Sequence, residues 1–188
     1  AAAWFTAGRT DALGETGARI AATVFALPGI SLVLHFGILN LTTAAWRRAG
    51  VDCPQLFRAP LAATSLSEFW GRRWNLAFSE MTAIGVYRPL SPWVGKSAAA
   101  AVAFLFSGLL HELAISVPVK AGFGLPLLYF ALHGGLVLVE RALERRGRPI
   151  HRRPWVGRTW TLAWVALPVP VLFHPPFLAG VIWPLVGV

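Results

Sequence analysis

Four apolar stretches, each long enough to cross a lipid bilayer, constrain the fold of this chain more than any other feature. They cover about residues 20–46, 97–119, 122–139 and 159–188. A bilayer is crossed by about 20 predominantly apolar helical residues. The last stretch contains "LPVPVLFHPP", whose prolines predict a break followed by a partial second span. The sequence therefore predicts four to five transmembrane helices.

The composition supports a chain surrounded by lipid. Of the 188 residues, 56% are hydrophobic and 13% are charged, and the mean hydropathy is +0.60. Charged residues make up about 25% of a typical soluble domain. We therefore expect an all-α integral membrane protein whose partner is the lipid bilayer. The single cysteine, Cys53, excludes an intramolecular disulfide and a multi-cysteine metal site, and no metal is expected.

The basic residues predict the orientation of the chain in the membrane. Residues 46–73 and 141–158 are rich in arginine, whereas the turn between the second and third stretches holds only Lys120. Cytoplasmic loops carry an excess of lysine and arginine, so both rich loops should be cytoplasmic and Lys120 should lie outside. This distribution also explains the net charge of +9 without a nucleic-acid partner, because the arginines flank apolar stretches.

Residues 65–88 predict a helix of a different kind. The sequence "SLSE" is a capping box that begins a helix after Ser65. Aromatic and charged side chains then recur near helical spacing: Phe69, Trp70, Arg72, Arg73, Trp74, Phe78 and Glu80. We expect an interfacial amphipathic helix along the cytoplasmic surface, ended by Pro89 and Pro92.

Two histidines occupy similar depths in the second and third stretches when both are counted from the shared outer turn. His111 follows Ser107 by four residues, which places the two within hydrogen-bond reach on one helical face. The neighbouring Glu112 is costly at membrane depth unless it is paired or borders a watery cavity. A structural role in hydrogen bonding between helices remains open for His111 and for His133. Structural or interfacial roles are expected for His35, His174 and Glu140.

Four motifs carry a resemblance to a known family. In chain order they are "RAPLAATSLSEFWGRRWN", "VYRPL", "FLFSGLLHELAI" and "LHGGLVLVE". Together they resemble the wax synthase branch of the membrane-bound O-acyltransferases (MBOATs), from about Leu34 to His174. The pairing of "FWGRRWN" with a downstream "SGLLHE" is specific, whereas "LHG" alone is weak.

The resemblance implies transfer of a fatty acyl group from acyl-CoA to a long-chain alcohol or another hydroxyl lipid, without a cofactor. In that family the histidine of the SGxxHE-like motif is catalytic, and it falls on His111; the asparagine ending the FWxRWN-like motif falls on Asn75. A histidine in apolar surroundings stays neutral and can act as general base. Asn75 is expected either to donate a hydrogen bond to the developing oxyanion or to hold the thioester in place. Supporting roles are assigned to Ser107, Glu112, Trp74 and His133. Arg72 and Arg73 have two alternative roles: they bind the acyl-CoA phosphates, or they anchor the helix at the cytoplasmic surface.

Members of that family usually have more spans than the four or five counted here, which predicts an N-terminally incomplete core. Two other classes are alternatives to the enzyme. One is a non-enzymatic lipid-binding or transport protein, and the other is a b-type haem protein with His111 and His133 as axial ligands. The haem alternative leaves the "FWGRRWN" helix unexplained. The oligomeric state is left open by the sequence.

Overall fold

The computed structural model describes residues 10–188, with side chains from residue 14 onward, and every regular element within this range is helical. Three helical stretches are long and apolar enough to cross a membrane: Gly14–Arg48, Leu76–Val119 and Leu125–Arg145. The helices Pro154–Leu172 and Pro175–Leu185, which meet at 67°, are together apolar enough to count as a fourth, broken span or as a re-entrant loop. These findings confirm the predicted all-α membrane fold.

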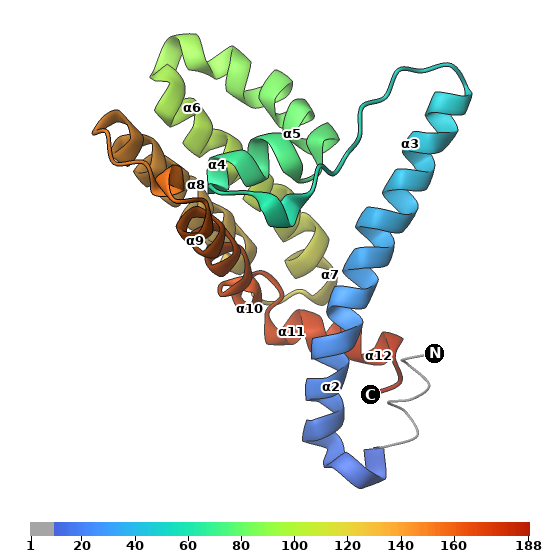
Figure 1. Ribbon diagram of the computed structural model, residues 1–188. Helices are drawn as coiled ribbons and strands as arrows, with labels where there is room; N and C mark the ends of the chain where they lie inside the picture. Colours follow the sequence, from blue (N-terminus) through green and yellow to red (C-terminus); the bar gives the residue numbers. More distant parts are fainter. Residues whose placement is uncertain (1–9) are drawn as a thin grey trace.

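The first span lies to one side of the other helices and contacts the C-terminal segment (Figure 1). It consists of α2 (Thr10–Leu32), a wider π-helical turn η1 (Val33–Ile38) and α3 (Leu39–Arg48). Most of its apolar side chains are exposed, as expected for a helix that contacts lipid. Near its N-terminal half, Trp183 Nε1 donates a hydrogen bond to Thr23 Oγ1 at 3.0 Å, which joins this span to the C-terminal segment.

Three short helices follow the loop after the first span. These are η2 (Pro60–Ala62), α4 (Leu66–Glu68) and η3 (Phe69–Arg73). The chain then breaks at Trp74, which is extended, and Asn75, which adopts the left-handed conformation with φ 41°. The helix expected over 65–88 is therefore discontinuous. No membrane boundary is defined by the structure, so the interfacial position of this segment stays a prediction.

The next three elements form a helical hairpin. Helix α5 (Leu76–Thr82) continues through η4 (Ala83–Tyr87) into α6 (Arg88–His111). Gly95 interrupts α6 with φ 82° and ψ 158°, a conformation that suits glycine, and the chain turns back there (Figure 1). The reversal brings Phe78 of the first arm to His111 of the second, with ring centroids 6.3 Å apart.

Helix α8 (Leu125–Arg145) packs along the second arm of the hairpin, which ends with η5 (Glu112–Ser116) and α7 (Val117–Val119). The approach is close at Gly108, where an added Cβ would lie 2.8 Å from the Leu127 side chain. Small residues allow such close packing of helices in membranes. The buried core beside this contact consists of Ile115, Tyr129, Phe130 and Leu172.

The C-terminal region crosses back over α8 in short pieces. They are η6 (Ile150–Arg152), α9 (Pro154–Ala166), α10 (Val169–Leu172), α11 (Pro175–Phe177), η7 (Leu178–Ile182) and α12 (Trp183–Leu185). His174 is fully buried at the bend: its Nδ1 accepts a hydrogen bond from Phe177 N at 3.2 Å, and its Nε2 lies 3.3 Å from Ser116 Oγ. The prolines produce the predicted break because they cannot continue a helix.

Candidate functional site

A cavity of about 830 Å³ lies between the hairpin, α8 and α9–α10, and apolar side chains form most of its wall. This volume is in the range of cavities that bind small-molecule ligands. The first span also contributes, through Ser31 and His35. Polar side chains form the smaller part of this wall, and their positions bear on the chemistry that the cavity can support.

His111 is the last residue of α6, directly before the π-helical turn η5, and its side chain lines the cavity. Its Nδ1 lies 2.7 Å from the backbone oxygen of Ser107. A carbonyl oxygen only accepts, so Nδ1 carries the hydrogen and Nε2 of the neutral ring is the acceptor. The ring packs 4.3 Å from Phe130, centroid to centroid. This arrangement leaves Nε2 available to accept a proton.

Ser107 and Glu112 differ in how they relate to His111. The Ser107 hydroxyl donates to Ala103 O at 3.0 Å, so the contact with His111 is made by the Ser107 backbone instead. Glu112 Oε1 accepts hydrogen bonds from Gly124 N at 2.8 Å and Leu127 N at 3.1 Å, at the beginning of α8. A carboxylate at a helix N-terminus is stabilised by the unpaired N–H groups there. The Glu112 carboxylate therefore caps α8, and it is not the group that orients the His111 ring.

Asn75 lines the same cavity as His111 and begins α5. Its left-handed conformation is one that asparagine tolerates better than most residues. Its Oδ1 accepts a hydrogen bond from Phe78 N at 3.4 Å, which leaves the side-chain NH₂ group without a partner among the described residues. The helix that begins after Asn75 also carries Phe78, whose ring contacts His111. The Asn75 amide and the His111 imidazole therefore line the same cavity.

Trp74 and His133 occupy different surroundings. Trp74 lines the cavity and stacks on Phe69 with ring centroids 5.5 Å apart, and it also packs 5.1 Å from His35. His133 is 0% exposed and is not part of the cavity wall. Its Nδ1–H donates to Tyr129 O at 2.8 Å, and its Nε2 is buried without a hydrogen-bond partner. His111 is thus brought to the cavity, whereas His133 is sealed beside it.

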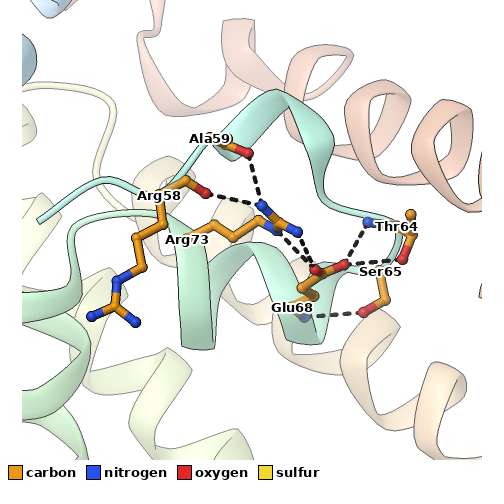
Figure 2. A network of polar contacts seen from close by, with 6 residues as sticks. All are labelled: Arg58, Ala59, Thr64, Ser65, Glu68 and Arg73. Carbon is orange, nitrogen blue, oxygen red and sulfur yellow. Dashed lines mark hydrogen bonds and ion pairs between the residues drawn. The ribbon is translucent and has the colours of Figure 1, made fainter. Parts of the chain in front are cut away.

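Arg73 is held in a polar network with Glu68 (Figure 2). Its Nε and NH2 groups contact Glu68 Oε1 at 2.8 Å and 2.7 Å, and NH1 donates to Arg58 O and Ala59 O. Burial alone would raise the pKa of the Glu68 carboxyl, but hydrogen bonds from Thr64 and Arg73 hold that pKa below its ordinary value. Arg72 is exposed, and neither arginine lines the cavity.

Two residues of α8 have contacts that the sequence did not indicate. Glu140, expected to be interfacial, is only 7% exposed; its carboxylate accepts hydrogen bonds from Leu66 N, Ser67 N and Trp160 Nε1. Arg141, assigned only to the basic loop, lines the cavity. The sequence does not indicate either position, because the partners of Glu140 and the other walls of the cavity lie on other helices. Across the described side chains, no three His, Cys, Asp or Glu residues gather into a metal-binding group.

Comparisons with known proteins give one consistent result. Residues 53–132 match the membrane bound O-acyl transferase family. The chain is 34% identical over 156 residues to a probable long-chain-alcohol O-fatty-acyltransferase 6 of Arabidopsis thaliana, covering 78% of this chain and 43% of that protein. It is 34% identical over 136 residues to the long-chain-alcohol O-fatty-acyltransferase of Simmondsia chinensis, covering 67% of this chain and 39% of that protein.

A relative with a different name shows similar coverage. The chain is 32% identical over 166 residues to acyl-CoA–sterol O-acyltransferase 1 of Arabidopsis thaliana, covering 82% of this chain and 48% of that protein. The chain thus spans less than half the length of these curated relatives. No solved structure matches the chain significantly. The predicted resemblance is confirmed by the family match and by these relatives.

Proposed function

The chain is a homologue of the membrane bound O-acyl transferases, and from this relationship we propose that it carries the site of an enzyme that moves a fatty acyl group from acyl-CoA to a long-chain alcohol. One observation supports this most directly. His111 faces a largely apolar cavity with its Nδ1–H tied to a backbone carbonyl, so Nε2 is the atom available as a base. Both substrates are lipid-like, and such a cavity suits their chains.

In the proposed reaction, His111 Nε2 takes the proton from the alcohol hydroxyl as the alcohol oxygen attacks the thioester carbonyl carbon. The new C–O bond gives a tetrahedral intermediate with a negative oxygen, toward which the Asn75 amide donates a hydrogen bond. The intermediate then collapses, the C–S bond breaks, and the CoA thiolate takes the proton back from the His111 imidazolium. The products are an ester and CoA, and neither a covalent acyl-enzyme nor a cofactor is needed.

The orientation of the chain is part of this proposal. Basic residues concentrate at 46–73 and 141–158, and cytoplasmic loops are enriched in lysine and arginine. We assign both loops to the cytoplasm, where acyl-CoA is available. The acceptor is proposed as a long-chain alcohol, with sterols as the comparison class because one relative is named for sterol acylation.

The test uses membranes from cells that express the protein, supplied with labelled acyl-CoA and a panel of long-chain alcohols and sterols. Lipid products are resolved by mass. We expect His111→Ala to lower the rate of ester formation by about 10²–10⁴-fold, the usual loss for a general base. Asn75→Asp retains an oxygen that can cap Phe78 N but removes the amide donor, and a loss of about 10²–10³-fold is expected.

His133→Ala is the control, because His133 lies in the neighbouring span but outside the cavity wall. Its rate per folded protein should stay within about tenfold of wild type, because the His133 ring lies outside the cavity wall and its Nδ1–H bonds to Tyr129 O within the same helix. Retention of more than about a tenth of the rate in His111→Ala would contradict the role of His111 as base.

A further inference from the structure

Arg141 places a positive charge at the end of the cavity remote from His111. The cavity-lining residues of α8 include Phe130, Val137 and Arg141, which are spaced by seven and four residues and so share one helical face. Phe130 packs against the His111 ring, while Arg141 lies eleven residues farther along the same helix. At about 1.5 Å per residue, the two positions are about 16 Å apart along the axis.

The charge of Arg141 is not neutralised by a hydrogen-bonded carboxylate among the described side chains. The adjacent Glu140 turns both of its oxygens toward Leu66, Ser67 and Trp160. The two ion pairs of the described region join Arg19 to Glu15 and Arg73 to Glu68, and neither includes Arg141. A half-buried guanidinium that faces a cavity without a counter-ion favours an anionic ligand there.

A second polar group points to the same end of the cavity. Ser67 also lines it, and its hydroxyl is buried with no hydrogen-bond partner. The Ser67 backbone is bonded to Glu140, the residue next to Arg141, so the two lining residues are held close together. A guanidinium and a free hydroxyl are both hydrogen-bond donors, and together they fit a phosphate group.

The spacing suits the shape of acyl-CoA. The pantetheine arm has about the backbone length of four extended amino-acid residues, or about 14 Å between the thioester sulfur and the diphosphate. With the thioester at His111, the diphosphate would reach the region of Arg141. We propose that Arg141, with Ser67, binds the phosphates of acyl-CoA and so selects nucleotide-bearing acyl donors; this inference rests on the proposed function. Arg73 is unsuited to that role because Glu68 and two carbonyl groups already occupy its guanidinium.

The test compares Arg141→Gln with Arg145→Gln. Arg145 is exposed, lies one turn farther along α8 and is absent from the cavity wall, so its variant controls for the lost charge. Initial rates are measured with acyl-CoA and with S-acyl-pantetheine, which lacks the phosphates. For Arg141→Gln we expect KM for acyl-CoA to rise about 10- to 100-fold, the range for losing a hydrogen bond to a charged group. KM for S-acyl-pantetheine and for alcohol should stay unchanged, as should all constants of Arg145→Gln.

A direct measurement separates this inference from the proposed function. Binding of radiolabelled CoA to the detergent-solubilised protein should weaken by the same factor in Arg141→Gln and should be unchanged in Arg145→Gln. Arg141→Lys keeps the positive charge, so its affinity for CoA should fall less than that of Arg141→Gln. This variant gives a second measurement in case Arg141→Gln does not fold. If wild type binds CoA but forms no ester, the proposed function is wrong, whereas the role of Arg141 in binding CoA can still be correct. Equal KM values for acyl-CoA in wild type and Arg141→Gln, or no binding of CoA by wild type, would overturn the role of Arg141.

Discussion

The Glu140 carboxylate provides a sharp test of how this fold is held together. Its Oε1 accepts hydrogen bonds from Leu66 N at 2.7 Å and Trp160 Nε1 at 3.0 Å, and Oε2 accepts from Ser67 N at 2.9 Å. One side chain of α8 thereby joins the beginning of α4 to α9. Replacement by alanine removes all three acceptors at once, in a place where the residue is only 7% exposed.

The expected magnitude follows from the three donors left behind. A buried donor without a partner costs about 1–3 kcal/mol, so Glu140→Ala should lower the free energy of unfolding by at least about 3 kcal/mol. Glu140→Gln keeps one oxygen, which can still serve Leu66 N and Trp160 Nε1. Its NH₂ group would face Ser67 N–H, so one donor is lost and the cost should be about a third of that for alanine.

The assay is unfolding of the detergent-solubilised protein followed by circular dichroism, which does not depend on any one tryptophan. Glu144→Ala is the matched control, because Glu144 is exposed one turn farther along the same helix, and it should change the free energy by less than about 0.5 kcal/mol. Trp160→Phe combined with Glu140→Ala should be less destabilising than the sum of the two changes. If Glu140→Ala and Glu144→Ala have the same free energy of unfolding, the hydrogen bonds of Glu140 to α4 and α9 do not hold the fold together.

Two further predictions concern orientation and pH. Cys53 lies in the first basic loop, so an impermeant maleimide should label it in right-side-out vesicles only after lysis; labelling of intact vesicles would reverse the assigned orientation. The pKa of Glu68 is held below its ordinary value near 4.5, so its ionised form stabilises the fold above that value, and this contribution is lost as the pH falls through the lowered pKa. The unfolding midpoint of wild type should therefore fall more steeply on acidification than that of Glu68→Gln, and parallel curves would exclude the Glu68 contribution.

The class of fold could be predicted from the sequence because lipid imposes a simple requirement. About 20 consecutive apolar residues form a helix that satisfies its own backbone, wherever the neighbouring helices lie. The break at Trp74–Asn75 could not be predicted in this way. It depends on the left-handed conformation of Asn75 and on hydrogen bonds from Arg58 N to Arg73 O and from Leu76 N to Leu56 O. Helical spacing of aromatic residues does not report such contacts.

The polar residues inside the spans show a second limit. The sequence indicates that Glu112 must have a partner, because an unpaired carboxylate at that depth is costly. It does not indicate that the partner is the beginning of α8, twelve residues away at Gly124 N. For Glu140 the partner Leu66 N is 74 residues away. Both carboxylates satisfy N–H groups that a short or buried helix leaves unpaired, which is a demand of the tertiary structure.

The polar residues within the spans differ in whether their polar atoms have hydrogen-bond partners. Glu140 and His174 accept hydrogen bonds from backbone N–H groups, and Glu112 does so through Oε1 while its Oε2 is buried without a partner. His111 Nε2 has no such partner, and its ring faces the cavity. The buried Nε2 of His133 is also unpaired, but it lies outside the cavity wall, where a substrate would not reach it. Unpaired polar atoms also occur in the cavity wall at Ser67, Trp70 and Thr82, and His35 makes the same contact from Nδ1 to a backbone oxygen. The proposal for His111 therefore rests on its place in the "SGLLHE" motif together with the position of its ring in the cavity wall.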